Sequence, residues 1–327
     1  MKIDTDKKKI TTENSNKKLM SDCTLCPRNC HADRTHNNFG VCGVGSEPVI
    51  ARAALHMWEE PCISGKEGSG TVFFSGCNLG CIFCQNYDIA HRKKGKAIST
   101  TRLSEIFLEL QDKNANNINL VTPTHFIPQI IDALMNAKKN GLSIPVIYNS
   151  SGYESVEMLQ MLDGLIDVYL PDLKYFSSEL SGKYSHATDY FEKASLAITE
   201  MVRQTGEPLF RTKDGILLTA DQYDDEAYIC KGTIVRHLLL PGCLEDSKSV
   251  IKYLYNTFGN QIYISIMNQY TPLKQVAGLP ELNRKVSPDD YEALVDYAIS
   301  LGVENGFIQE GDVAAESFIP EFDSSGI

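Results

Sequence analysis

The sequence has no long apolar run, and no stretch approaches the ~18 consecutive apolar residues that a membrane-spanning helix needs. Its first twenty residues, MKIDTDKKKITTENSNKKLM, lack the apolar segment of a signal peptide and contain no arginine, which a transit peptide would have. We therefore expect a cytoplasmic protein in a reducing compartment, with no membrane partner. Positive charge is also scarce, because 31 basic residues against 42 acidic ones give a formal net charge of −11. This balance argues against a nucleic-acid partner bound by phosphate neutralisation.

Cysteine, in contrast, is abundant, with ten in 327 residues. Hydrophobic residues make up 43% of the chain, so a core can form without disulfides. Since disulfides are rare in a reducing compartment, metal binding or catalysis is the expected reason for the cysteines.

Short apolar runs alternate with helical patterns from residue 71 onward. The expected strands are 71–76, 117–122, 144–149, 165–172, 233–240 and 261–267. The expected helices are 101–112, 126–139, 153–163, 188–204, 247–258 and 288–301. Near-continuous apolar strands separated by helices predict a parallel sheet covered by helices. Six such units favour an α/β fold, a partial (β/α)6 TIM-like barrel, over a doubly wound open sheet.

The remaining segments complete the expected domain organisation. It consists of a disordered tail (1–20), a Cys-rich N-terminal extension (21–65), a barrel domain (66–312) and a C-terminal tail (313–327). Residues 46–70 are expected to form a connector into the first strand. Residues 205–232 interrupt the alternation and are expected to be an insertion, such as a hairpin lid.

The first strand leads directly into CNLGCIFC, where Cys77, Cys81 and Cys84 have the spacing C-x3-C-x2-C. Three thiolates on one tight loop can hold three corners of a cubane iron–sulfur cluster and leave one iron open, whereas electron-transfer cubanes use four cysteines. The loop lies at the carboxyl end of a strand, where barrel enzymes build their active sites. A zinc loop or a group of buried free cysteines is the alternative interpretation.

CNLGCIFC resembles the signature of the radical S-adenosylmethionine (radical SAM) superfamily. The resemblance covers roughly residues 23–310, and the segments 51–90 and 117–130 resemble the PflX-like subgroup of pyruvate formate-lyase activating enzyme homologues. It implies that Cys77, Cys81 and Cys84 bind a [4Fe-4S] cluster and that SAM chelates its open iron. It also implies reductive cleavage of SAM to methionine and a 5′-deoxyadenosyl radical, which takes a hydrogen atom from a substrate.

The resemblance further implies contacts to SAM from the cysteine loop and the second strand end. Phe83 would lie near the adenine, or would be a core aromatic of the loop. Where related enzymes have a Gly-Gly-Glu segment, this chain has Thr122, Pro123 and Thr124. Backbone carbonyls and threonine hydroxyls would then accept the hydrogen bonds of the SAM ammonium group. His125 would be a ligand contact or a residue of the helix start.

The third and fourth strand ends supply further candidate SAM-binding residues. Asn149, Ser150 and Ser151 would bind the ribose, and either serine could instead cap a helix. Asp172 and Lys174 resemble the Asp-Leu-Lys segment of glycyl-radical activating enzymes. They would bind the SAM carboxylate or an incoming peptide, unless they form a simple surface ion pair.

Two further strand ends carry weaker candidates. Arg236 and His237 are adjacent in a strand, so alternation sends them to opposite faces, and one of them would point into the barrel. Gln269 and Tyr270 follow the sixth strand at the same end of the sheet.

The N-terminal extension carries a second group of cysteines, with the spacing C-x2-C-x3-C-x11-C: Cys23, Cys26, Cys30 and Cys42. Four thiolates suffice for tetrahedral zinc or for a second iron–sulfur cluster, and His31 or His36 could replace a cysteine. The alternative is a loop of free thiols. Cys62 has no assigned role, and Cys230 and Cys243 are expected to be ordinary buried thiols.

The resemblance predicts a glycyl-radical enzyme as the substrate and partner, and a flavodoxin- or ferredoxin-type protein as the reductant. One alternative is a radical SAM enzyme that modifies a small molecule or another macromolecule. A second alternative is a non-catalytic iron–sulfur electron carrier, because two cysteine groups would suit such a protein.

Overall fold

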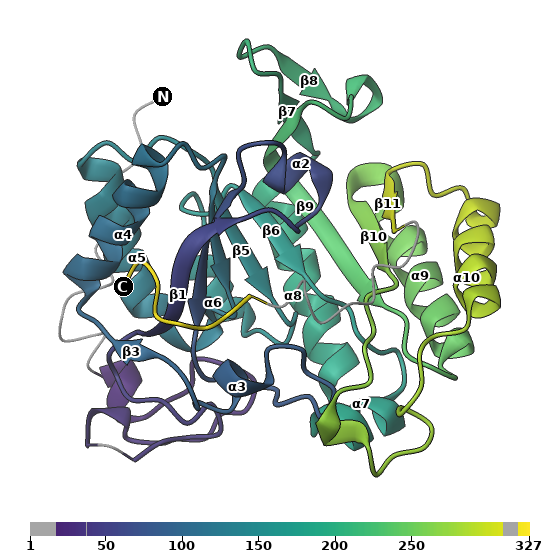
Figure 1. Cartoon of the computed structure of the whole chain (residues 1–327), viewed down its shortest axis with the longest axis horizontal. Helices are drawn as coiled ribbons and strands as arrows, with labels where there is room; N and C mark the ends of the chain where they lie inside the picture. The colour runs from purple at the N-terminus through teal and green to yellow at the C-terminus, as the bar shows by residue number, and fades with distance from the viewer. Residues whose placement is uncertain (1–17, 37, 310–319) are drawn as a thin grey trace.

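The computed structural model describes residues 18–36, 38–309 and 320–327. One sheet runs through the molecule in the order β11-β10-β9-β6-β5-β4-β2-β1-β3 (Figure 1). Six of its strands pair in parallel: β2 (Ser69–Phe74), β4 (Ile118–Val121), β5 (Val146–Ser150), β6 (Val168–Pro171), β9 (Tyr228–Leu238) and β10 (Tyr263–Met267). They are the six expected strands. β11 (Gly306–Ile308) adds a seventh parallel strand beside β10.

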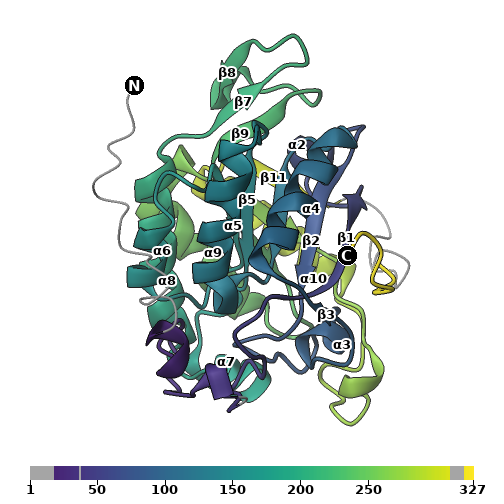
Figure 2. The same ribbon diagram turned by 90° about the vertical axis from the view of Figure 1, so that its left-hand side faces the viewer.

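Helices follow the parallel strands and cover the outer face of the sheet (Figure 2). They are α4 (Thr100–Asp112), α5 (Ile127–Lys139), α6 (Val156–Met161), α8 (Tyr190–Thr205), α9 (Leu244–Phe258) and α10 (Pro288–Leu301). Each agrees with an expected helix. The regular alternation along a partly open parallel sheet confirms the α/β class and the partial (β/α)6 barrel.

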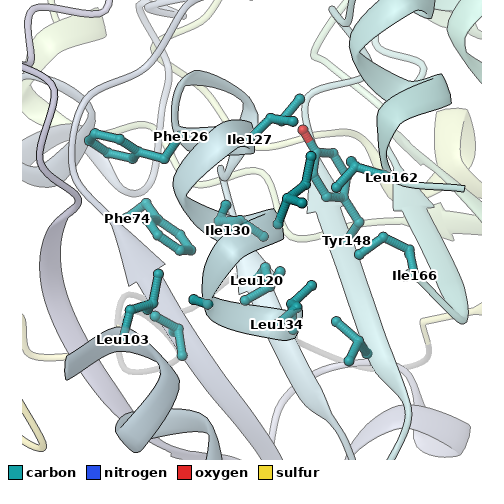
Figure 3. Packing of buried hydrophobic residues seen from close by; sticks show 14 of the residues in the cluster. Phe74, Leu103, Leu120, Phe126, Ile127, Ile130, Leu134, Tyr148, Leu162 and Ile166 are labelled. Carbon is teal, nitrogen blue, oxygen red and sulfur yellow. The ribbon is translucent and has the colours of Figure 1, made fainter. Parts of the chain in front are cut away.

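The largest part of the core lies between the sheet and the helices α4 and α5 (Figure 3). Phe74, Leu120 and Tyr148, from three adjacent strands, pack against Leu103 of α4 and Ile130 of α5, and all five are fully buried. Burying a side chain of this size stabilises a fold by about 1.5–3 kcal/mol. This packing fixes the position of the strand ends that carry the candidate site.

The segment before the first parallel strand is also part of the sheet. β1 (Val49–His56) pairs antiparallel with β2 and carries β3 (Lys96–Ala97) on its other edge. The expected connector over 46–70 is therefore wrong in this part, because the apolar side chains Ile50, Ala51 and Ala53 of β1 are buried. Shorter helices connect the main elements: α2 (Pro61–Ser64), α3 (Tyr87–Ala90), α7 (Ser178–Ser185), η1 (Arg34–His36), η2 (Thr124–Phe126), η4 (Gly259–Gln261) and η5 (Lys274–Val276).

The insertion over 205–232 is a hairpin, as expected. β7 (Leu209–Arg211) and β8 (Leu217–Thr219) pair antiparallel, the turn η3 (Ala220–Gln222) follows, and β7 also pairs with the start of β9. Because β9 is parallel to its neighbours, the hairpin projects from the amino ends of the strands (Figure 1). It lies at the opposite end from the cysteine loop that follows β2, so it is not a lid over that loop.

Both ends of the described chain pack on the barrel. The disordered tail expected over 1–20 is wrong at its end, because Met20 is 2% exposed and belongs to the core; residues 1–17 lie outside the described residues. At the other end, Ser324 N donates to Ala51 O at 3.1 Å and Ala53 N donates to Ser325 O at 2.9 Å, so this segment pairs with β1. None of the described helices is long and apolar enough to cross a membrane.

Candidate active site

The cysteine triplet lies on the loop that leaves the carboxyl end of β2. Gly76, at φ +88°, turns the chain, and a Cβ added there would lie 2.7 Å from Cys42 O. Two hydrogen bonds reach the thiols, since Leu79 N donates to Cys77 Sγ at 3.3 Å and Ser185 Oγ donates to Cys81 Sγ at 2.9 Å. Cys77, Cys81 and Cys84 all line one cavity of about 470 Å³. The sequence therefore places three thiols together at the expected end of the barrel.

The environment of the thiols is apolar. Burial raises the pKa of Cys81 to about 11, although the positive charge of Lys174 opposes the shift. Burial also raises the pKa of Cys84, and the neighbouring thiols add to the effect. Metal binding here must therefore displace protons. Within the described ranges, no three His, Cys, Asp or Glu side chains are placed to hold a single metal ion. A cubane cluster does not require this, since each thiolate binds a different iron.

Most of the other predicted site residues line the same cavity. These residues are Phe83, Thr122, Asn149, Ser150, Ser151, Asp172 and Lys174. Thr124 is not among them: it is buried in η2, and its hydroxyl donates to the Glu154 carboxylate at 2.6 Å. His125 is buried beside it and contacts Ser75 O through Nε2 at 2.8 Å, and burial lowers the pKa of His125 to about 3. It is thus a neutral residue of the helix start.

The two serines at the carboxyl end of β5 do not cap a helix. α6 begins at Val156 after Ser155, so the capping interpretation of Ser150 and Ser151 is wrong. Ser150 Oγ instead accepts a hydrogen bond from Gly152 N at 3.2 Å. Ser151 Oγ is buried and has no hydrogen-bond partner among the described residues, although the residue lines the cavity. A polar ligand in the cavity would satisfy this hydroxyl.

Two aromatic candidates pack together. The Phe83 ring lies 6.5 Å from that of Tyr175 and 6.2 Å from that of Tyr270, and it is 6% exposed. Tyr270 is held by a hydrogen bond from its hydroxyl to Leu282 O at 2.6 Å. Phe83 therefore belongs to the core and also borders the cavity, while Gln269 borders the cavity beside it.

Charged side chains form a continuous chain across the cavity wall. Lys174 Nζ lies 2.5 Å from Asp172 Oδ2, and Arg236 bridges two acids, through Nε to Asp172 Oδ1 at 3.1 Å and through Nη1 to Glu59 Oε2 at 3.2 Å. Arg236 Nη2 also donates to Asn149 Oδ1 at 2.6 Å. The side chains of Lys174 and Asp172 are only 15% and 13% exposed, so the surface ion-pair interpretation is wrong.

Register decides which residue of the Arg236–His237 pair enters the barrel. Arg236 lines the cavity, whereas His237 lies on the other face, with Nδ1 2.7 Å from Leu173 O. Burial lowers the pKa of His237 to about 4, so it is neutral. Burial alone would raise the pKa of Asp172, but Lys174 and Arg236 outweigh it and hold that pKa below its usual value.

Three carboxylates near the site were missed by sequence reasoning. Glu59 and Glu60 line the cavity from the segment before α2, and burial raises the pKa of each against the opposing charge of Arg236. Glu154 is buried behind η2, where it also accepts a hydrogen bond from Tyr148 at 3.1 Å. The available signal was the pair of adjacent acids in HMWEEPC, which lies in the segment that carries the resemblance.

The N-terminal cysteines lie in a segment with little regular structure. Cys23 and Cys42 are buried, and Cys26 and Cys30 are half-buried. The four thiols are near neighbours, because Cys42 interacts electrostatically with Cys23, Cys26 and Cys30. The two candidate histidines are exposed and pair with acids instead: His31 with Asp22 at 2.7 Å and His36 with Asp33 at 2.8 Å.

Arg28 connects this segment to the cysteine triplet. Its guanidinium donates to Asn78 O at 2.7 Å and Leu79 O at 3.3 Å on the triplet loop, and to Ser185 O at 3.2 Å and His186 O at 2.5 Å at the end of α7. Leu79 and Ser185 are the residues that hydrogen-bond the thiols of the triplet. The two cysteine groups thus share one arginine as a structural link.

Several known proteins are similar to this chain in sequence or in fold. The uncharacterized protein MJ0674 of Methanocaldococcus jannaschii is 27% identical over 292 residues, which cover 86% of this chain and 75% of that protein. Among solved structures, methylornithine synthase (PylB) matches with a TM-score of 0.51 and 13% identity over 97% of this chain and 82% of that one.

SuiB of Streptococcus suis, bound to its precursor peptide SuiA, matches with a TM-score of 0.47 and 13% identity over 72% of this chain. This chain spans about half the length of SuiB, since the match covers 47% of it. The family model of the radical SAM superfamily matches residues 71–231, which include the triplet, Asn149, Asp172 and Lys174. Residues 71–231 of this chain therefore match the radical SAM superfamily.

Proposed function

We propose that this protein activates a glycyl-radical enzyme by taking a hydrogen atom from a backbone glycine. The superfamily supports reductive cleavage of SAM at a [4Fe-4S] cluster. The finer assignment is supported by the resemblance of residues 51–90 to activating enzymes and by the Asp172-Leu173-Lys174 segment. The observation that carries the proposal is that Asp172 and Lys174 line the same cavity as the cysteine triplet.

The residues of the cavity fit the two cofactors that the superfamily implies. Cys77, Cys81 and Cys84 would hold the cluster, and no fourth cysteine lines the cavity among the described residues. The orphaned hydroxyl of Ser151 needs a polar partner, and it lies on the strand end expected to bind the ribose. When bound, the cluster and SAM supply one electron and the sulfonium whose cleavage yields a 5′-deoxyadenosyl radical.

The protein's own residues bind, orient and exclude water. Lys174 acts electrostatically on Cys81. Burial alone would lower the pKa of Lys174, but Asp172 and Cys81 together outweigh it and raise that pKa, so the lysine is positively charged beside the triplet. A fixed positive charge there would offset the negative charge of a thiolate-bound cluster. Phe83 and Leu79 cover the loop with apolar surface, which limits access of water.

Anaerobic reconstitution with iron and sulfide tests the proposal. Addition of dithionite, or of a flavodoxin- or ferredoxin-type reductant, should give 5′-deoxyadenosine from SAM. With a candidate glycyl-radical enzyme present, a glycyl-radical signal should appear in electron paramagnetic resonance (EPR) spectra. Deuterium should move from labelled glycine into 5′-deoxyadenosine. SAM cleavage that never yields a glycyl radical would refute the activating role, and absence of SAM binding would indicate an electron carrier.

One observation favours a second candidate, a radical SAM enzyme that acts on a small molecule. A backbone glycine carries no charge, yet the cavity wall includes the buried ion pairs of Arg236 with Glu59 and Asp172. Buried charges are costly and often serve recognition. Transfer of deuterium from a labelled small substrate, without a protein partner, would support this candidate.

We also propose that the N-terminal quartet of Cys23, Cys26, Cys30 and Cys42 binds zinc or a second iron–sulfur cluster. The proximity of the four thiols in a segment with little regular structure supports it. Since no three described side chains are already placed to hold a single ion, a metal would draw the thiols together and so organise the segment. Metal analysis of the Cys77→Ala/Cys81→Ala/Cys84→Ala protein should still find iron or zinc, and a metal-free protein would refute this proposal.

A further inference from the structure

Glu60 is a buried carboxylate without adequate partners. The residue is 9% exposed and lines the cavity, and its Oε2 atom has no hydrogen-bond partner among the described residues. Burial raises the pKa of the carboxyl group, and it outweighs the opposing effects of the Arg236 charge and of the Ser265 hydroxyl. A buried acceptor left unpaired costs free energy, so such an atom in a native protein calls for a ligand or an ion.

Among the described residues, the cavity wall also holds one more acid than it holds bases. The acids are Glu59, Glu60 and Asp172, and the bases are Lys174 and Arg236. Both bases are already engaged, since Lys174 pairs with Asp172, and Arg236 pairs with Glu59 and Asp172. His56 also lines the cavity, but burial lowers its pKa, so it does not supply the missing positive charge.

The surroundings of Glu60 suit an organic cation better than a metal ion. Within the described part of the chain, no three acid, histidine or cysteine side chains are placed to hold a metal ion. Ser265 pairs in register with Phe307, and Met267 lies on the same face of β10; both apolar side chains line the cavity. A carboxylate beside an apolar wall fits a charged group on an alkyl chain.

The position of Glu60 relates it to the reaction. It directly precedes α2, whereas the cysteine triplet lies on the loop before α3, and these helices lie at opposite ends of the parallel strands (Figure 1). A molecule bound to Glu60 and extending through the cavity would therefore point toward the triplet.

We infer that Glu60, supported by the Glu59–Arg236 pair, binds an alkylammonium or guanidinium group of the substrate at the floor of the cavity. This inference rests on the proposed radical SAM reaction at the opposite end of the same cavity. It identifies the substrate as a molecule with a positively charged group on a chain. The charged group anchors one end, and the atom that loses hydrogen lies toward the cysteine triplet.

Binding of small probes to the reconstituted full-length protein tests this site without measuring turnover. Saturation-transfer NMR and calorimetry would use agmatine and n-butylammonium, with n-butanol as the uncharged counterpart. The cations should bind at least about tenfold more tightly than butanol, because a hydrogen bond to a buried charged group is stronger than a neutral one. Glu60→Gln should remove most of this preference, while the exposed control Glu192→Gln should keep it.

A pair of peptide ligands and a second variant of Glu60 complete the binding experiment. A capped peptide with arginine beside glycine, and its citrulline counterpart, distinguish a protein side chain from a free small molecule as the source of the cation. Glu60→Asp, which keeps the charge, should keep a preference for cations even if Glu60→Gln folds poorly. Equal affinity of wild-type protein for the cations and butanol would overturn the inference and show that Glu60 is a buried, protonated acid.

SAM affinity and 5′-deoxyadenosine formation, measured in parallel, separate the two proposals. Loss of SAM binding with intact cation preference would refute the proposed function and leave the cation site. Normal SAM cleavage without cation preference would refute only the inference.

Discussion

The two cysteine groups have related spacings but different surroundings. The triplet Cys77, Cys81, Cys84 has intervals of three and two residues, and the quartet begins with intervals of two and three at Cys23–Cys26–Cys30. The triplet follows a buried parallel strand and opens into the 470 Å³ cavity. No cysteine of the quartet lines that cavity in the part of the chain that the structure describes. Spacing alone therefore does not define the reactive site, and its position at a strand end does.

The supports of the two groups differ as well. The triplet is held by the barrel, through the strand β2 and the end of α7. The quartet is held by Arg34 and by the core. Arg34 is 1% exposed, donates to Val44 O and His125 O, and approaches Cys23 Sγ at 3.7 Å, while Cys23 and Cys42 are buried in the core cluster. This contrast indicates that the barrel would stay folded without metal, whereas the N-terminal segment would depend more on whatever its thiols bind.

The largest expected effect comes from removing one thiol of each group in turn. Cys81→Ala should abolish reductive SAM cleavage, because one corner of the cluster loses its ligand. Cys26→Ala should lower the thermal unfolding temperature and the metal content but leave measurable SAM cleavage. Measurement of 5′-deoxyadenosine, iron and zinc in both variants checks the contrast. Equal loss of activity in the two would show that the quartet also takes part in the reaction.

Glu154 offers the next largest effect, and it lies close enough to Cys26 to interact with it electrostatically. Burial raises the pKa of Glu154 from 4.5 to about 7, although hydrogen bonds from Thr124 and Tyr148 lower it. The protonated carboxyl group therefore contributes fully to the free energy of unfolding below pH 4.5, and this contribution is lost as the pH rises through about 7. Glutamine does not titrate, so Glu154→Gln should remove this loss. Relative to wild type, the free energy of unfolding of the variant should rise by roughly 3 kcal/mol between pH 4.5 and pH 8.

Urea unfolding across this pH range, under anaerobic conditions, measures the effect. Infrared difference spectra should also show a protonated carboxyl group in wild type at pH 6 that is absent in Glu154→Gln. The control is Glu157→Gln, at the exposed start of α6. Its free energy of unfolding should fall with rising pH as that of wild type does. If the free energy of unfolding of Glu154→Gln depended on pH as that of wild type does, Glu154 would be ionised over the whole pH range in the folded protein.

The contrast between the two cysteine groups also shows which features could be predicted from the sequence. The strands, the helices and the triplet were predictable, because apolar periodicity and a short motif are local features. Barrel geometry then placed Asn149, Ser151, Asp172 and Lys174 together, since the carboxyl ends of parallel strands meet at one edge. The resemblance added the cofactors, which no local pattern beyond the triplet indicates.

Residues whose roles depend on distant contacts were not predictable. The Thr124 hydroxyl is hydrogen-bonded to Glu154, which is 30 positions away in the sequence. Glu59 pairs with Arg236, which is 177 positions away. Glu59 and Glu60 reach the cavity only because β1 runs antiparallel to β2 and returns the chain to the barrel floor. The side of the sheet that Arg236 faces depends on strand register, which alternation alone leaves open.

The smallest expected effect, and the sharpest test of the comparison, concerns Arg28. It lies between two cysteines of the quartet but donates to carbonyls of the triplet loop and of the end of α7. Arg28→Gln should destabilise the protein by about 2 kcal/mol, the order expected when several charge-assisted hydrogen bonds to partly exposed carbonyls are lost. Arg28→Lys should recover only part of this, because an ammonium cannot reach all of these oxygens at once.

Two readouts distinguish a structural link from a simple anchor. If Arg28 only fastens the N-terminal segment, Arg28→Gln should lower the thermal unfolding temperature and leave the EPR spectrum of the reduced cluster unchanged. If it holds the triplet loop, the same substitution should also broaden that spectrum, because Leu79 and Ser185 would no longer fix the hydrogen bonds to Cys77 and Cys81. The structure favours the second result, since each segment that hydrogen-bonds a triplet thiol also accepts a hydrogen bond from Arg28. The two cysteine groups would then be distinct in chemistry but coupled in geometry.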